Sequence, residues 1–208
     1  MQEKVRSIID ILTGHYPDAL CALHYKTDYQ LLIAVRLSAQ CTDARVNMVT
    51  PALFAAYPTL EAFAQANITD VEQYIHSCGF FRQKAKDIVQ TCQILLDKHD
   101  GKVPDSMEAL LQLPGVGRKT ANLLLGDIFK QPGSIVCDTH CIRICGRLGL
   151  SQGKDPEKVE RQLREILPPE ESGDFCHRIV LFGRDICTAR NPQCHRCPLS
   201  MHCTQWNI

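Results

Sequence analysis

Apolar side chains recur at intervals of three and four residues along almost the whole chain, and this spacing predicts α-helices. Sustained alternation of apolar and polar residues, which would indicate strands, is hard to find. Residues 1–12 have the pattern of an amphipathic helix, without the long apolar run of a signal peptide or a membrane span. We therefore expect an all-α fold with no membrane segment.

Start and stop signals predict where several of these helices begin and end. Residues 69–72 and 105–108 have the spacing of capping boxes, and Asp155-Pro156 is a typical helix start. Pro51 lacks a backbone N–H, so we expect it to kink or split a helix within 43–57.

The charges balance, which limits how the chain could bind a nucleic acid. Its 208 residues include 23 Lys and Arg against 23 Asp and Glu. Binding through bulk positive charge is therefore excluded, and any contact with phosphates must come from local clusters of basic residues.

Four of the twelve cysteines form the pattern Cys187-x6-Cys194-x2-Cys197-x5-Cys203. Without a signal peptide we place the protein in a reducing cytoplasm, where clustered cysteines indicate metal binding more often than disulfides. Structural zinc modules usually supply two short Cys or His pairs, whereas four unevenly spaced thiolates suit a [4Fe–4S] cluster. The spacing alone leaves iron–sulfur and zinc open.

The other eight cysteines are scattered through apolar helical patterns, and we expect them to pack as buried thiols. They are Cys21, Cys41, Cys78, Cys92, Cys137, Cys141, Cys145 and Cys176. The repeat of Cys137, Cys141 and Cys145 at every fourth residue leaves a second face for a soft metal open.

A glycine-rich segment, Leu-Pro-Gly-Val-Gly-Arg-Lys-Thr-Ala at 113–121, lies between two predicted helices. The glycines permit a tight turn with bare amides, and the second helix adds unpaired N–H groups, so the element can cradle a phosphate. Lys119 lies in the first turn of that helix beside Arg118. Both the helix end and the guanidinium favour a neutral amine, which a Schiff-base nucleophile needs. A simple charge contact with phosphate is the alternative for Lys119.

An acidic residue, Asp138, follows Lys119 by nineteen positions within Val-Cys-Asp-Thr-His. Asp138 or Thr139 is placed to cap a helix that continues through Leu148. The helix after Lys119 leads the chain about 16 Å away, and the residues after Lys130 can span up to about 26 Å back. Asp138 can therefore reach Lys119, although an isolated aspartate at a helix start is usually only a cap.

Together these motifs resemble the helix-hairpin-helix DNA glycosylases, and most closely the endonuclease III family among them. The resemblance covers nearly the whole chain, through segments 37–43, 79–86, 113–119 and 136–140 and the four-cysteine tail. It implies a [4Fe–4S] cluster and two helical lobes. One lobe, 21–133, would be a six-helix barrel with the hairpin. The other, 1–20 with 134–208, would hold the cluster, and DNA would lie in the cleft between them.

The resemblance also implies a reaction on double-stranded DNA that contains damaged pyrimidines or abasic sites. Lys119 would attack C1′ of a flipped nucleotide, with Asp138 activating the amine, and β-elimination would cut the strand. Gln40 would fill the vacated space, and Phe80 matches a wedge position where leucine is usual. Core packing is the alternative for Phe80. The further DNA contacts expected are Gly115, Val116, Gly117, Arg118, His140 and Arg190.

Other functions remain open within and outside this class. A monofunctional adenine glycosylase, a mismatch uracil or thymine glycosylase, and a non-catalytic iron–sulfur module that binds DNA are the alternatives. Lys119 argues against the adenine branch, which does not use a hairpin lysine. We expect a monomer whose DNA-facing side gathers the positive charge, with the following residues contributing: Arg82, Lys84, Lys86, Arg118, Lys119, Arg178, Arg184, Arg190 and Arg196.

Overall fold

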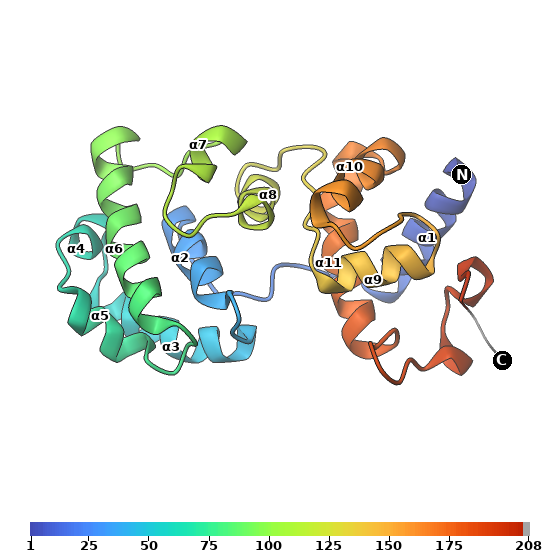
Figure 1. Ribbon diagram of the computed structural model, residues 1–208, viewed down its shortest axis with the longest axis horizontal. Helices are drawn as coiled ribbons and strands as arrows, with labels where there is room; N and C mark the ends of the chain where they lie inside the picture. The colour runs from blue at the N-terminus through green and yellow to red at the C-terminus, as the bar shows by residue number, and fades with distance from the viewer. Residues whose placement is uncertain (206–208) are drawn as a thin grey trace. The chain divides into compact units, whose positions relative to one another are not determined.

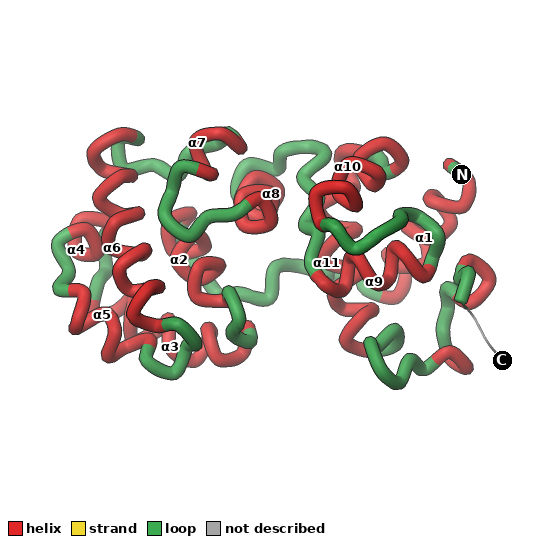
Figure 2. Tube along the Cα trace, viewed as in Figure 1, coloured by secondary structure: helices red, strands yellow, loops and turns green. Residues whose placement is uncertain are grey.

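The computed structural model describes residues 1–205, and within this range every regular element is a helix (Figures 1 and 2). The α-helices are α1 (Gln2–His15), α2 (Asp28–Ser38), α3 (Asp43–Ala56), α4 (Leu60–Ala64), α5 (Ile68–Ile75), α6 (Phe81–Lys98), α7 (Met107–Leu111), α8 (Arg118–Asp127), α9 (Thr139–Arg147), α10 (Pro156–Ile166) and α11 (Ser172–Asp185). The all-α prediction is confirmed. No helix in this part of the chain is both long and apolar enough to cross a membrane.

The chain divides into two compact units. Ala22–Phe129 forms one, and Met1–Cys21 forms the other together with the chain from Lys130 onward. The second unit is therefore discontinuous in sequence, because its first helix precedes the whole of the other unit.

The unit Ala22–Phe129 is built around α2 and α6. Seven of the eleven residues of α2 are buried, including Leu31, Ile33 and Leu37, as expected for a helix that is apolar on all sides. Helix α6 packs against α4, α5 and α2, and α2 also packs against α3 and α8. The hairpin helix α8 is thus held directly by the central helix of this unit.

The discontinuous unit has its core between α1, α9, α10 and α11. Helix α11 packs against α1 and α9, and its Phe175, Ile179 and Phe182 are buried. The half-buried Cys187 and Cys197 pack against this same core. The four-cysteine segment is therefore supported by the apolar interior of the unit.

Two predicted helix starts are wrong. In each case a neighbouring residue caps the helix in place of the predicted one. Asn67 caps α5, with its side-chain oxygen accepting from the Thr69 N–H at 2.9 Å. Ser106 caps α7 in place of Asp105. The predicted start of α10 is confirmed, since Asp155 Oδ1 accepts from the Lys158 N–H at 2.7 Å.

Pro51 does not split its helix, because α3 runs without interruption from Asp43 to Ala56. The proline ring lies on the exposed side of the helix, whereas Val46, Thr50 and Leu53 are buried. Packing of these three side chains holds the helix together across the missing backbone donor.

Candidate functional site

The predicted hairpin joins α7 to α8 through a tight turn. Leu113 and Val116 are buried at its base, where the Val116 N–H donates to the Leu113 carbonyl at 3.1 Å. Gly115 has a φ of 71°, in the left-handed region that favours glycine. Gly117 is the N-cap of α8 and offers no side chain to the first N–H groups of that helix. These amides are consequently free of a side-chain cap, as a phosphate cradle requires.

A buried ion pair lies directly beneath this turn. Arg36 of α2 donates to Asp87 Oδ2 of α6 through Nε at 2.8 Å and through Nη2 at 2.6 Å. Gln83 Nε2 donates to the other carboxylate oxygen at 2.7 Å. A Cβ atom added to Gly115 would lie 2.6 Å from Arg36 Cδ and 2.7 Å from Asp87 Oδ2. Arg36 and Asp87 therefore position the turn, a role that no local sequence pattern indicated.

We expect Gly115→Ala to destabilise the protein far more than Gly117→Ala. Alanine at 115 would adopt a left-handed conformation and overlap Arg36, which together cost about 2–4 kcal/mol. Gly117 has an ordinary φ, and a Cβ there meets no atom within 4 Å, so a change below about 1 kcal/mol is expected. Urea unfolding, monitored by circular dichroism, measures the change in unfolding free energy for both variants. Equal effects of the two substitutions would contradict the supporting role of the ion pair.

The two predicted catalytic residues have the expected local settings. Lys119 is the second residue of α8, and its side chain is exposed. Asp138 is the N-cap of α9, with Oδ1 accepting from the Cys141 N–H at 2.7 Å, which confirms its predicted capping role. They belong to different units, and their approach to one another stays a prediction.

His140, in the first turn of α9, is half-buried and linked to the cysteine segment. Its Nδ1 lies 3.2 Å from Arg143 Nη2, and because a guanidinium only donates, Nδ1 is the acceptor. The same Arg143 nitrogen donates to the Cys187 carbonyl at 2.9 Å. Gly183 of α11 makes room for the ring, since a Cβ there would lie 2.5 Å from His140 Nδ1. Arg143 thus couples a predicted DNA contact to the first cysteine of the motif.

Gln40 and Phe80 lie in two exposed loops that touch. Both have a positive φ, 52° and 58°, which costs a non-glycine residue about 1–2 kcal/mol. Phe80 is 67% exposed, so the core-packing alternative is wrong. A Cβ on Gly79 would lie 3.4 Å from the Gln40 carbonyl oxygen, which places the two loops in contact. Strained residues of this kind occur where a function requires them.

The four cysteines of the motif line one cavity of about 120 Å³, together with Arg147, Ile186, Pro192, Gln193 and Gln205. Burial raises the pKa of Cys197 above its usual range, and the thiols of Cys187, Cys203 and Cys194 raise it further. The thiols are therefore close enough to interact electrostatically. Among the described residues, no group of three or more His, Cys, Asp or Glu side chains is arranged to hold a metal ion. Four thiols around one cavity fit an iron–sulfur cluster.

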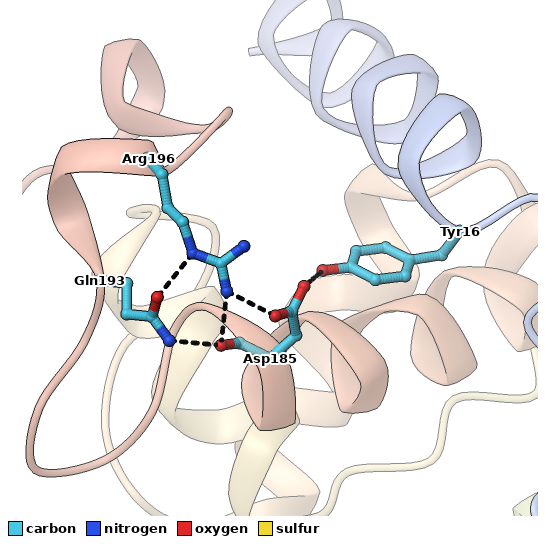
Figure 3. Close-up of polar contacts among 4 residues, drawn as sticks. All are labelled: Tyr16, Asp185, Gln193 and Arg196. Atoms are coloured by element: carbon cyan, nitrogen blue, oxygen red, sulfur yellow. Dashed lines mark hydrogen bonds and ion pairs between the residues drawn. The ribbon is translucent and has the colours of Figure 1, made fainter.

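Side chains of the discontinuous unit anchor the segment that carries these cysteines (Figure 3). Arg196 Nη2 donates to Asp185 Oδ1 at 2.6 Å, and Arg196 Nε donates to Gln193 Oε1 at 2.6 Å. The Tyr16 hydroxyl donates to the other Asp185 oxygen at 2.9 Å. Arg196 and then Tyr16 lower the pKa of Asp185, while burial and then Asp185 raise that of Tyr16. Asp185 at the end of α11 thus joins α1 to the cysteine segment.

Three cations of the predicted DNA-facing set have other roles. Arg196 pairs with Asp185, Arg178 is 8% exposed and donates to the Tyr16 carbonyl, and Lys84 is 1% exposed. The assignments of Lys84 and Arg178 are wrong, because burial cannot be seen along a sequence, whereas the exposed Arg196 stays a predicted phosphate contact. Arg190 is exposed, as expected for a phosphate contact.

Cys21 and Cys41 also depart from expectation, because both are half-buried. The other six cysteines predicted to be buried are buried. Cys141 and Cys145 lie with their sulfur atoms 3.9 Å apart inside the core. That contact explains the four-residue repeat as packing.

A second arginine, Arg147 at the end of α9, holds the first cysteine of the motif. Its Nη1 donates to Cys187 Sγ at 3.1 Å and to the Thr188 carbonyl at 2.9 Å, and Nη2 donates to the Ala189 carbonyl at 3.3 Å. Sequence reasoning missed it, since forty residues separate the two partners. Hydrogen bonds to ligand sulfur atoms tune iron–sulfur clusters.

We expect Arg147→Met to lower the reduction potential of the cluster and to speed its loss. The hydrogen bond from the Arg147 guanidinium to sulfur stabilises the more negative, reduced cluster, and the substitution removes it. The substitution also leaves two carbonyls of the loop without their donor. Voltammetry and the decay of visible absorbance under a chelator measure the two effects. Arg190→Met, in the same loop and exposed, is the matched control. A potential unchanged in Arg147→Met would contradict the assignment.

Comparison with protein-family models shows the class of protein to which this chain belongs. One family model, for HhH-GPD superfamily base excision DNA repair proteins, matches residues 33–169. A second, for the iron–sulfur binding domain of endonuclease III, matches residues 187–203, the segment of the four cysteines. The fold and the cysteine site are thus those of a DNA glycosylase of base excision repair that carries a [4Fe–4S] cluster.

Comparison with individual proteins identifies the family within this class. Endonuclease III of Synechocystis sp. is 46% identical over 97% of this chain and 92% of its own, and endonuclease III of Escherichia coli (strain K12) is 40% identical over 94% and 92%. A solved structure of a trapped endonuclease III–DNA covalent intermediate superimposes with a TM-score of 0.92 at 42% identity, covering 98% of this chain and 96% of that one. The chain belongs to the endonuclease III family. The resemblance and the cofactor predicted from the motifs are confirmed.

Proposed function

We propose that this protein is a bifunctional DNA glycosylase and abasic-site lyase that removes oxidised pyrimidines from duplex DNA. Lys119 is the nucleophile, and the strand is cut 3′ to the abasic site by β-elimination. The observation that carries the proposal is an exposed amine in the first turn of α8, directly after the glycine hairpin. A relative covering nearly the whole chain forms a covalent intermediate with DNA, which supports a lysine adduct here.

Binding begins at the hairpin and at the two strained loops. The uncapped amides of α8 hold a phosphate without a net positive charge, and Gly115 and Gly117 allow the backbone to approach it. Phe80 enters the base stack as an apolar wedge, and Gln40 occupies the space that the flipped nucleotide leaves. His140 and Arg190 contact the backbone of the same duplex.

The chemistry then follows from an amine and a carboxylate. The Lys119 nitrogen forms a bond to C1′ while the base departs with the electrons of the glycosidic bond. Asp138 accepts the ammonium proton and stabilises positive charge on the sugar. The C1′–O4′ bond then breaks, O4′ takes up a proton, and the resulting iminium acidifies the C2′ proton, whose loss expels the 3′ phosphate. Water finally hydrolyses the Schiff base and frees Lys119.

The cluster has a structural role in this proposal. Cys187, Cys194, Cys197 and Cys203 would hold the cluster, and its binding would order the loop that carries Arg190. The protein acts as a monomer on DNA in the cytoplasm. Its balanced charge predicts a shallow dependence of binding on salt concentration.

A lesion panel in duplex DNA tests the proposal, with base release and strand cleavage scored separately. The duplexes contain thymine glycol, uracil opposite guanine, adenine opposite 8-oxoguanine, or an abasic site. We expect release with cleavage at thymine glycol, and cleavage at the abasic site. Release without cleavage would indicate a monofunctional glycosylase. Binding without either reaction would indicate the non-catalytic alternative. A thermostable thymine-DNA glycosylase shares the fold at 21% identity, so the fold alone does not choose the substrate.

A further inference from the structure

Two thiols meet beneath the loops that carry Gln40 and Phe80. Cys41 lies just after α2, and Cys78 directly precedes the Gly79-Phe80 turn that leads into α6. The two turns are in contact, since a Cβ on Gly79 would lie 3.4 Å from the Gln40 carbonyl oxygen, and the Cys41 thiol interacts with the Cys78 thiol. Cys78 is fully buried and Cys41 is half-buried, so a small reagent from solvent reaches the pair through Cys41.

The pair lies beside a buried ammonium group. Lys84 is 1% exposed, and its Nζ donates to the Leu37 carbonyl at 2.8 Å, in the turn of α2 before Cys41. Both thiols act electrostatically on Lys84, and Arg45 also acts on Cys78. The thiolate is the form of a cysteine that reacts with peroxides. Burial above all raises the pKa of Cys78 to about 11, so Cys78 is the protonated member of the pair.

We propose that Cys41 and Cys78 form a reversible redox pair that hydroperoxides oxidise to a disulfide, which changes the two DNA-inserting loops. The Cys41 thiolate attacks the peroxide oxygen, the O–O bond breaks, and Cys41 becomes a sulfenic acid. The Cys78 sulfur then attacks the Cys41 sulfur and displaces hydroxide, which leaves as water with the Cys78 proton. In total two thiols and one hydrogen peroxide give one disulfide and two waters.

The consequence for DNA rests on the proposed function. A disulfide brings the sulfur atoms to about 2.05 Å, closer than two unbonded thiols can approach. The loops already touch at Gln40 and Gly79, and both hold a residue with a positive φ. Closing the sulfur distance therefore shifts Gln40 and Phe80. The oxidised protein binds a damaged duplex more weakly, and reduction restores binding.

Several other thiols among residues 1–205 are arranged differently. Cys141 and Cys145 are in contact, but both are buried and lie on one helix. Cys92 is buried as well, and the four motif cysteines belong to the cluster site. Cys41 is a half-buried cysteine whose thiol partner, Cys78, is buried on another segment.

The first test maps thiols in the cluster-loaded protein and needs no activity. The protein is treated with equimolar hydrogen peroxide, and iodoacetamide then blocks the remaining free thiols. Proteolysis and mass spectrometry identify the linked peptides, and the visible absorbance reports whether the cluster is retained. We expect a Cys41–Cys78 peptide that dithiothreitol removes, while the cluster absorbance persists. Cys41→Ser should form no such linked peptide. In Cys78→Ala, oxidation of Cys41 should end at the sulfenic acid, which dimedone labels. Cys21→Ser, at another half-buried cysteine, is the matched control and should react as the unaltered protein does. Absence of the linked peptide, or loss of the cluster before it forms, would overturn the pair.

The second test measures affinity for a duplex with a tetrahydrofuran abasic analogue. We expect oxidation to weaken binding at least about fivefold in the unaltered protein and to leave Cys41→Ser unchanged. Unchanged affinity despite the mapped disulfide would overturn the effect on the loops. Failure of the reduced protein to bind this duplex would instead contradict the proposed function, and the thiol map would still decide whether the pair exists.

Discussion

Replacing Lys119 with alanine is expected to abolish the complex that borohydride traps on duplex DNA containing thymine glycol. Strand cleavage should fall on the order of 10⁴- to 10⁶-fold, the scale on which loss of a covalent nucleophile acts. The side chain is exposed, so the helical circular dichroism and the unfolding midpoint should not change. Denaturing electrophoresis of the borohydride-treated mixture measures the complex directly.

Lys102→Ala is the matched control for this experiment, because Lys102 is an exposed lysine of the same unit that lies outside the hairpin. The Lys102→Ala protein should form the borohydride-trapped complex as efficiently as the unaltered protein does. Trapping that survives Lys119→Ala would show that another amine is the nucleophile.

Asp138→Asn is expected to reduce base release about 10²- to 10⁴-fold, the usual contribution of a general acid or base. Its effect on stability should stay below about 1 kcal/mol, because an asparagine oxygen can still accept the Cys141 N–H and cap α9. Asp138→Ala removes both the carboxylate and the cap, so it should lose activity and about 1 kcal/mol of unfolding free energy. Single-turnover base release and urea unfolding separate the two roles.

Asp155→Asn provides the control, since Asp155 caps α10 with the same geometry. Its substitution should leave base release unchanged. If Asp138→Asn retained full activity while Asp138→Ala lost it, the role of Asp138 would be confined to capping.

Local signals in the sequence predicted the elements of this fold well. Helical periodicity, the Asp155-Pro156 start and the Asp138 cap depend on residues within one or two turns of each other, and the structure has each of them. The misplaced starts of α5 and α7 arose where two good capping residues stand close together. Local preference cannot choose between such caps, because packing of the whole helix decides.

The candidate site was predictable only where its residues are close in sequence. The cysteine motif and the hairpin are contiguous, so their chemistry could be inferred from spacing. The Arg36–Asp87 pair and the Arg147–Cys187 contact join distant segments and leave no local pattern. The burial of Lys84 was equally invisible, because a lysine close to Arg82, Gln83 and Lys86 in a helix has the sequence signature of a solvated charge.

The packing of α1 against α11 determines the order in which the protein can be assembled during synthesis. Ala22–Phe129 is continuous and can fold as soon as it leaves the ribosome. Helix α1 emerges first but must wait for α11, with Val5, Ile8 and Leu12 uncovered in the meantime. Those apolar side chains therefore stay exposed during this interval, and the cysteine site can receive iron only after Cys203 has been synthesised.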